Sequence, residues 1–292
     1  MHALMRSAAL SAAVYGLLAA PAQAVPQATV DAVVTPAWIE RNGRTRPLDV
    51  GMEVKNGDRI RTGDGARAYL KLAEGSTVKI GEKASLGFFS RSLKPNRSFR
   101  GALDVATGAF RFTTDALRRV KERDVAVRVG TATVGIRGTD VWGKSDGTQD
   151  LVMLIDGRIE VRHASGETVE MGEPLTVFVA PKGAAPLPLT TASQEELHAR
   201  ALETEIVPGD GAARRGGRWK LSLGSFADEA SALERYDLAR EAGFAAVIVP
   251  RATEDGAWVY EVVQKGFADE AEAQRTAARL KAATGFAAAP AR

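Results

Sequence analysis

Apolar and polar residues alternate in many short runs over residues 28–180. Residues 66–72 alternate small or apolar side chains with polar ones, and residues 76–80 repeat the alternation after a Glu-Gly pair. A period of two is typical of strands that bury one face. Because turn signals return about every 8 to 12 residues, the pattern predicts an all-β domain built as a sandwich, a barrel or a short solenoid.

Three local features belong to this β region. Asn42 and Gly43 form the dipeptide that two-residue hairpins prefer, so we expect a hairpin there. Residues 113–122 combine Ala, Leu, Arg and Lys, which predicts a helical turn or an exposed loop. His163 stands in a hairpin-like segment that ends at Gly166, and we interpret it as an exposed turn residue.

Residues 181–217 differ from the strands before them because Pro, Gly and small residues dominate. Ser193 followed by Glu196 is a capping box, which predicts a short helix that ends near Glu205. The arginines and glycines of residues 214–217 indicate flexible chain. We therefore expect a linker that carries one short helix.

Residues 218–292 repeat one pattern twice. Residues 219–230 and 260–271 each run from an alternating strand through a Gly-containing turn into an Asp-Glu helix start. A strand-like run at 246–249 lies between them, and a short Ala-rich strand at 285–289 completes the order β-α-β-β-α-β. This order predicts an α+β domain with an antiparallel sheet, both helices on one face and the other face open.

The first 24 residues have the features of an export signal. Arg6 precedes an apolar run at residues 7–20, and residues 21–24 place small side chains two positions apart. As a helix the run would reach roughly 21 Å, whereas a bilayer core is about 30 Å thick. We therefore expect residues 1–24 to be a cleaved signal peptide, with an uncleaved anchor or a buried helix as the alternative. The mature chain should be a soluble periplasmic protein with no transmembrane segment.

The composition of the chain excludes several kinds of covalent, metal and catalytic site. The chain has no Cys, which excludes disulfides, thiolate metal sites, a cysteine nucleophile and a lipid-modified cysteine. Of its three His residues, His2 would leave with the signal and the other two stand far apart, so we expect neither a zinc site nor a triad. The formal net charge of +3 suits an anionic wall or membrane surface better than a nucleic acid. We expect no metal and no cofactor.

Two segments of the β region resemble the FecR domain. The first is residues 51–80, which contain VKNGDRIRTG at 54–63 and LAEGSTV at 72–78, and the second is VGTATVGIRGTD at 129–140. The resemblance implies a periplasmic all-β interaction domain over residues 28–180 with an undefined ligand or envelope partner. FecR itself crosses the inner membrane and regulates a sigma factor. This chain is expected to have no cytoplasmic segment, so that activity is not carried over.

Residues 218–292 resemble the SPOR domain through LSLGSF at 221–226 and KGF at 265–267. The resemblance implies the same β-α-β-β-α-β fold. It also implies a partner, the glycan strands of peptidoglycan that lack stem peptides, as found at division septa.

Candidate glycan-binding residues follow from the strand pattern and this resemblance. Alternation places Lys220 and Ser222 on the open face, opposite Trp219 and the leucines that should lie under the helices. A cation suits the lactyl carboxylates of muramic acid, whereas Ser222 is shorter than the Gln common in the family. Trp258 is either a stacking residue or a core residue, and Phe226 is expected in the core. The candidates are Arg218, Lys220, Ser222, Ser225 and Trp258.

No segment has a catalytic motif. Residues 130–138 are rich in Gly but lack the Gly-Lys-Ser/Thr of a phosphate-binding loop, so we interpret them as turns. No acidic pair stands in a recognisable glycosidase motif. The first hypothesis is therefore a peptidoglycan-binding envelope protein and not an enzyme. The alternatives are a periplasmic sensor that works through a membrane partner and a wall-remodelling enzyme.

Overall fold

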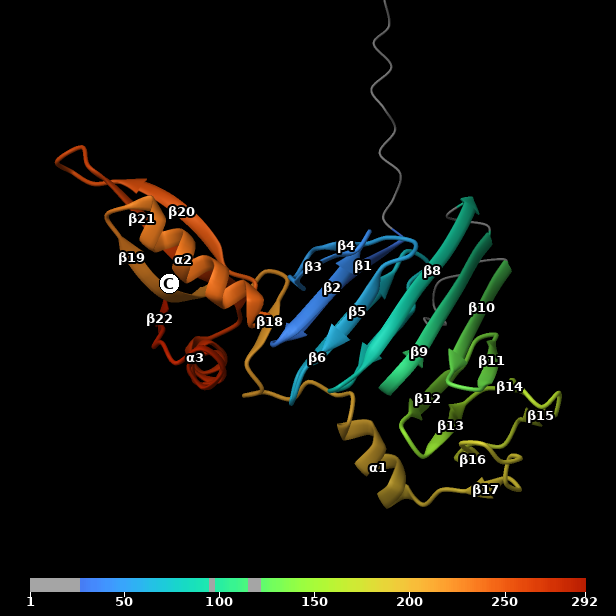
Figure 1. Ribbon diagram of the computed structural model, residues 1–292. Helices are drawn as coiled ribbons and strands as arrows, with labels where there is room; N and C mark the ends of the chain where they lie inside the picture. Colours follow the sequence, from blue (N-terminus) through green and yellow to red (C-terminus); the bar gives the residue numbers. More distant parts are fainter. Residues whose placement is uncertain (1–26, 95–97, 115–121) are drawn as a thin grey trace, which may run out of the picture.

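The computed structural model describes residues 27–94, 98–114 and 122–292 (Figure 1). The predicted signal peptide and residues 115–121 of the predicted helical turn or loop lie outside these ranges. The strands before the connector are β1 (Ala28–Val34), β2 (Ala37–Arg41), β3 (Arg44–Pro47), β4 (Glu53–Val54), β5 (Arg59–Thr62), β6 (Arg67–Leu72), β7 (Thr77–Ile80), β8 (Ser85–Lys94), β9 (Ser98–Thr113), β10 (Glu122–Val129), β11 (Ala132–Ile136), β12 (Asp140–Ser145), β13 (Gln149–Asp156), β14 (Ile159–His163), β15 (Thr168–Met171) and β16 (Thr176–Pro181).

These strands form two sheets packed face to face, so the all-β prediction is confirmed in its sandwich form. One sheet has the order β1-β6-β7-β9-β12-β13-β16, and the other has β3-β2-β5-β8-β9-β10-β11-β14-β15. The long strand β9 belongs to both sheets, because its first half pairs with β8 and β10 and its end pairs with β7 and β12. Apolar side chains from both sheets form one core between them.

The Asn-Gly hairpin is confirmed. Asn42 and Gly43 have φ values of 52° and 74° and join β2 to β3 directly. Positive φ at both central positions is what a type I′ turn requires, and its twist matches that of the flanking strands.

The interpretation of His163 as an exposed turn residue is wrong. Its side chain is buried at the end of β14. One ring nitrogen lies 2.9 Å from the hydroxyl of Ser165, and the other lies 3.1 Å from the hydroxyl of Thr131. Both ring nitrogens therefore have partners, which makes burial of the polar ring tolerable. Thr131 lies 32 residues earlier, so local sequence does not reveal the contact.

The predicted linker, residues 181–217, packs on the sandwich through backbone pairing. We call this segment the connector. Its strand β17 (Thr190–Thr191) extends the first sheet beside β16. Helix α1 (Gln194–Leu202) begins after Ser193, and Ser193 and Glu196 form the predicted capping box. Strand β18 (Ala212–Arg214), which includes part of the segment expected to be flexible, pairs with β1. Backbone pairing at both ends thus holds this connector against the sandwich.

Glu205 anchors the middle of the connector. Its carboxylate accepts a hydrogen bond from the Tyr69 hydroxyl at 2.9 Å, forms an ion pair with Lys79 and lies 3.3 Å from Arg111. Burial raises the pKa of Glu205, but the hydrogen bonds from Lys79 and Tyr69 outweigh burial and hold the pKa below its ordinary value. The charged form of Glu205 therefore fastens the connector to the sandwich.

The C-terminal part has the predicted β-α-β-β-α-β order. Its elements are β19 (Trp219–Phe226), α2 (Glu229–Glu241), β20 (Val247–Ala252), β21 (Trp258–Phe267), α3 (Glu270–Thr284) and β22 (Ala289–Ala291). The strands form an antiparallel sheet in the order β20-β21-β19-β22. Asp228 and Asp269 cap the two helices as expected. The last strand begins at Ala289, where the predicted strand ended, and it pairs with β19 over three residues.

The C-terminal domain packs directly on the sandwich and its connector. Strand β18 lies between them (Figure 1): Ala213 pairs with Val33 of β1 on one side and with Phe267 of β21 on the other. The guanidinium of Arg279 donates to the carbonyl of Gly65 at 3.1 Å, which adds a second tie between α3 and the sandwich. In the described ranges, no helix is both long and apolar enough to cross a membrane.

Candidate functional site

The C-terminal sheet has one face free of helices. Helices α2 and α3 pack on the opposite face, where Leu221, Leu223 and Val262 contribute to the core. Residues that pair directly across antiparallel strands point to the same side. Lys220 pairs with Lys265 and Ser222 pairs with Val263, so these positions lie on the helix-free face. The predicted orientation of the first strand therefore agrees with the pairing.

Glu261 is the central charged group of the helix-free face. Its carboxylate lies 3.6 Å from the ammonium of Lys220 and 3.3 Å from the guanidinium of Arg251. Sequence reasoning selected Lys220 but missed Glu261 and Arg251. A signal was present, because Glu261 stands between Tyr260 and Val262, which both pack in the core, and alternation turns it the other way. The face thus has one acid between two bases.

A β-bulge brings Ser222 and Ser225 to the same face. The two serines are three residues apart, so strict alternation would turn them to opposite sides. The pairing register shifts between Ser222 and Gly224, after which Ser225 pairs with Glu261. Gly224 has a φ of 141°, and a Cβ there would lie 2.7 Å from the ring of Phe226. Glycine is therefore needed at the bulge, and the bulge turns both serines to the face that carries Glu261.

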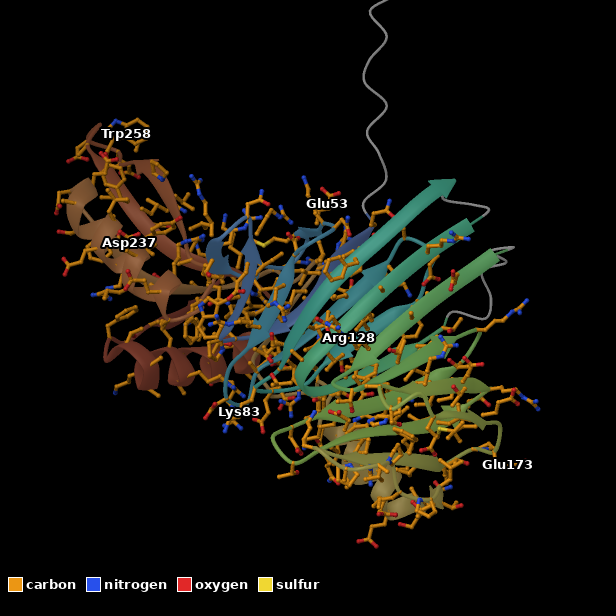
Figure 2. All side chains as sticks on the ribbon, turned by 45° about the vertical axis from the view of Figure 1, so that its right-hand side comes forward. Glu53, Lys83, Arg128, Glu173, Asp237 and Trp258 are labelled. Atoms are coloured by element: carbon orange, nitrogen blue, oxygen red, sulfur yellow. The ribbon has the colours of Figure 1, made fainter. Side chains whose placement is uncertain are left out.

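The structure does not bring Trp258 together with the other candidates. Its side chain is 57% exposed at the outer tip of the β20–β21 hairpin (Figure 2). It alternates with Tyr260 and Val262, so it belongs to the helix side of the sheet. It also lies seven residues from Lys265 along β21, which is roughly 24 Å at about 3.4 Å per residue. A ligand that reaches both Lys220 and Trp258 would have to follow the strand and cross its edge.

Trp219 and Phe226 have the core role that the sequence predicts. Both side chains are partly buried and pack against the core beneath the helices. Arg235 of α2 covers Phe226, with its guanidinium carbon 5.5 Å from the ring centroid.

The candidate Arg218 lies apart from Lys220 and Glu261. It precedes β19 and lines a separate pocket.

Family comparisons identify both halves of the molecule. Residues 58–160 match the model of the FecR protein family, and residues 216–291 match the model of the SPOR domain. The chain carries a FecR domain followed by a SPOR domain. Both families are non-enzymatic and typical of envelope proteins. The SPOR domain indicates peptidoglycan binding, and the FecR domain indicates a signalling role.

Comparison with solved structures finds a weak overall likeness. Two crystal structures of a candidate anti-sigma factor from Parabacteroides distasonis, at 1.65 Å and 2.50 Å, are 14% and 15% identical to this chain. The alignments cover 78% of this chain and 92% and 91% of the others, each with a TM-score of 0.41. The comparison with curated proteins found no match.

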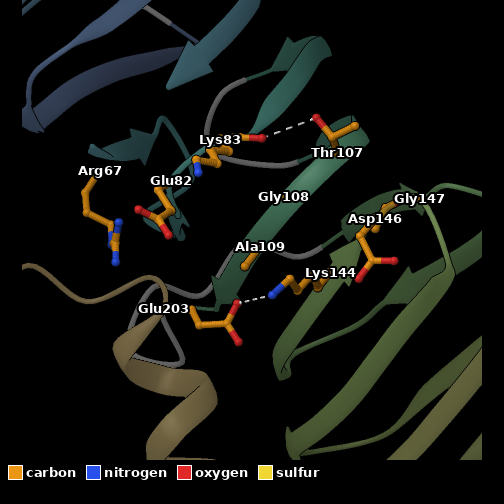
Figure 3. A pocket seen from close by; sticks show the side chains of 11 residues that line it. Arg67, Glu82, Lys83, Thr107, Gly108, Ala109, Lys144, Asp146, Gly147 and Glu203 are labelled. Atoms are coloured by element: carbon orange, nitrogen blue, oxygen red, sulfur yellow. Dashed lines mark hydrogen bonds and ion pairs between the residues drawn. The ribbon is translucent and has the colours of Figure 1, made fainter. Parts of the chain in front are cut away.

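The FecR domain has a pocket of about 380 Å³ beside the connector, and several of its lining residues are charged (Figure 3). Lys144 reaches across it to Glu203, at 2.8 Å, from the end of α1. Glu82 accepts a hydrogen bond from the backbone N–H of Gly65 at 2.7 Å. Arg67, Lys83 and Asp146 add charge of both signs to the lining. The pocket is a candidate ligand site, and the connector forms part of its wall.

A buried polar cluster packs against the start of the FecR motif at residues 129–140. Asp150 is fully buried and accepts hydrogen bonds from the backbone and hydroxyl of Thr131 at 2.8 and 2.6 Å and from Lys182 at 2.5 Å. Burial raises the pKa of Asp150, but these hydrogen bonds outweigh it, so the pKa lies below its ordinary value. A Cβ at Gly130 would meet the Asp150 carboxylate at 2.1 Å. The Gly-rich segment therefore packs on Asp150.

Among the residues that the structure describes, no three His, Asp or Glu side chains gather where they could hold a metal ion. The pocket beside the connector is lined mainly by Arg, Lys, Asp, Glu, Ser and Thr, and the helix-free face carries Lys, Arg, Glu and Ser side chains. Such groups hydrogen-bond polar or charged ligands directly.

Proposed function

We propose that this chain is an exported periplasmic protein that binds peptidoglycan glycan strands lacking stem peptides through the helix-free face of its SPOR domain. The observation that carries the proposal is the group formed by Lys220, Ser222, Ser225, Arg251 and Glu261. The two hydroxyls can hydrogen-bond the hydroxyl and amide groups of sugars, and the two bases can pair with the lactyl carboxylates of muramic acid.

Removal of stem peptides supplies the charge that this face recognises. In intact peptidoglycan the lactyl carboxyl group forms a neutral amide bond with the stem peptide, whereas in the stripped strand it is a free carboxylate. A strand carboxylate would compete with Glu261 for Lys220 and Arg251, whose ion pairs with Glu261 are partly exposed. Discrimination between intact and stripped strands then rests on charge-assisted hydrogen bonds. Stripped strands are found at division septa, which places the protein there in this proposal.

A pull-down of the full mature chain on purified sacculi tests the proposal. Binding should increase after an amidase strips the stem peptides. Lys220→Gln should weaken it by about tenfold or more, since a hydrogen bond to a charged group contributes about 1.5–3 kcal/mol. Lys281→Gln is the matched control, because Lys281 is exposed on α3 at the helix side of the domain. Binding that is unchanged by the amidase, or equal losses in both variants, would contradict the proposal.

A sensory role is the second candidate function. It is supported by the FecR family match and by the pocket near Lys144 and Glu203, where a ligand would contact both the sandwich and the connector. A periplasmic sensor needs a membrane protein to relay its state. Crosslinking in intact cells should then recover such a partner, and recovery of soluble proteins alone would argue against this role.

Imaging of a secreted fluorescent fusion in dividing cells tests the glycan-binding role. A midcell band supports that role, and a uniform periplasmic halo argues against it.

A further inference from the structure

A pocket rich in arginine lies where the connector enters the SPOR domain. It has a volume of about 740 Å³ and lies between the end of β18, the start of β19 and the turn before α3. We call it the arginine pocket. Its lining comprises Arg214, Arg215, Gly216, Gly217, Arg218, Trp219, Ala268 and Arg292.

The four arginines concentrate positive charge in this pocket. Arg215, Arg218 and Arg292 are exposed and Arg214 is half-buried. Within the described ranges, none of the four forms an ion pair with Asp or Glu, unlike Arg41, Arg111 and Arg128 of the sandwich. The acid nearest in sequence to the pocket wall is Asp269. Its carboxylate is engaged, because it caps α3 by accepting from the backbone N–H of Glu272 at 3.0 Å.

Three of the four arginines are anchored by contacts of their backbone or side chain. Arg214 pairs with Ala32 of β1 through its backbone, and Arg215 donates its N–H to the carbonyl of Asp31 at 3.3 Å. Arg292 stacks over Trp219, with the guanidinium carbon 5.2 Å from the ring centroid. An anion in this pocket could therefore interact with several guanidiniums at once.

The number and type of charges indicate the class of ligand. A guanidinium forms two parallel hydrogen bonds with the oxygens of a phosphate or carboxylate. One carboxylate offers two oxygens and one negative charge, so it would balance only one of the four guanidinium charges. A phosphate monoester or diphosphate offers more oxygens and at least about 1.5 charges at neutral pH, so it matches four guanidiniums better.

We infer that the arginine pocket is a binding site for a phosphate group that carries about two or more negative charges. The site is distinct from the helix-free face, because its lining excludes Lys220, Ser222, Ser225, Arg251 and Glu261. The phosphate is presented either by a soluble phosphate ester or by a lipid headgroup. Its position beside β18 means that the ligand contacts the connector and the SPOR domain together.

Calorimetric titration of the full mature chain with inorganic pyrophosphate at low ionic strength tests the inference. We expect saturable binding of one pyrophosphate per chain. The double variant Arg218→Gln/Arg292→Gln should bind about tenfold more weakly or worse, given the strength of hydrogen bonds between charged groups. The matched control is Arg44→Gln/Arg46→Gln, which removes two exposed arginines of β3. Circular dichroism should show both double variants folded.

The same titration with citrate and with vesicles separates the alternatives. Tighter binding of citrate than of pyrophosphate, an equal loss in the control variant, or no saturable binding would each overturn the inference. Co-sedimentation with phosphatidic acid vesicles, but not with phosphatidylcholine vesicles, identifies a lipid headgroup as the source. Pyrophosphate binding without co-sedimentation identifies a soluble phosphate. The Arg218→Gln/Arg292→Gln variant should still bind sacculi, because the helix-free face is unchanged in it. Binding to sacculi and binding to pyrophosphate can therefore be lost independently, so either proposal can fail alone.

Discussion

The carboxylate of Glu272 accepts a hydrogen bond from the backbone N–H of Gly211 at 2.5 Å, across 61 residues of sequence. The same carboxylate accepts from the N–H groups of Gly209 and Ala212, each at 2.8 Å. Glu272 is only 7% exposed, so these three donors compensate for its removal from water. Through this side chain, α3 of the SPOR domain binds the backbone of the connector at residues 209–212.

Replacement of Glu272 should destabilise the contact between the two domains. Glu272→Gln puts an amide NH₂ among N–H donors, so at least one donor loses its acceptor, at a cost of about 1–3 kcal/mol. Denaturant unfolding should show the loss as a lower midpoint. Glu270→Gln, at an exposed position in the first turn of the same helix, should change the midpoint little. Equal shifts in the two variants would mean that the connector is not held through Glu272.

The same contact predicts where a stable SPOR fragment begins. A fragment of residues 218–292 begins two residues inside the family match of residues 216–291, and it leaves the carboxylate of Glu272 without its three donors. A fragment of residues 208–292 keeps them and should have a free energy of unfolding higher by about 2 kcal/mol or more. Introducing Glu272→Gln into both fragments should remove most of the difference. If the difference persisted, it would come from other contacts of β18.

Neutralisation of Glu261 should strengthen the binding of stripped glycan strands. In the free protein Glu261 competes for Lys220 and Arg251, and partly exposed pairs of this kind contribute about 0.2–1 kcal/mol each. Glu261→Gln should therefore raise affinity by about two- to fivefold at low salt, and the gain should shrink as salt screens the charges. Sacculus binding at two salt concentrations measures this. A loss of affinity in Glu261→Gln would show instead that the carboxylate itself binds sugar groups.

Asp150 should make the stability of the FecR domain depend on pH. Its folded-state pKa is below the ordinary value of 3.8, so the folded protein binds protons less readily there than the unfolded chain. The resulting stability is complete above about pH 4 and is lost as pH falls through the folded-state pKa. Asp150→Asn should cost roughly 2–4 kcal/mol at neutral pH, because Lys182 and Thr131 lose a buried charged partner.

Thermal unfolding of wild type and Asp150→Asn from pH 7 to pH 3 measures this effect. The gap in melting temperature should be constant down to about pH 4 and narrow below it. Asp156→Asn, at an exposed position of the same strand, is the control. A gap that stays constant to pH 3 would show that the contribution of Asp150 does not come from its charge.

Elements whose determinants are local were predictable from the sequence. The Asn42-Gly43 hairpin, the capping box at Ser193 and the aspartate caps of α2 and α3 all depend on residues within four positions of each other. The order of the SPOR elements follows from the same local signals. The last strand was placed too early, because its three residues form by pairing with β19 and not by their own Ala-rich composition.

The candidate site was predictable only in part. Alternation placed Lys220 and Ser222 on the helix-free face, as the strand pairing has them. Family likeness selected Ser225, and a β-bulge, which alternation does not predict, turns Ser225 to the same face. The sequence did not indicate Arg251, because its contact with Glu261 depends on the pairing of β20 with β21. Trp258 was a candidate by residue type, and the strand pairing moved it to a distant tip.

The sequence by itself determined which segments form strands and helices, the two families and the chemistry that the missing cysteines exclude, because these depend on residue type and short-range order. The tertiary structure decided that the connector is docked, that His163 and Asp150 share a buried cluster and that Glu272 joins the domains. Each of these depends on polar groups far apart in sequence that must be paired once they are buried. Only the folded chain shows which groups those are.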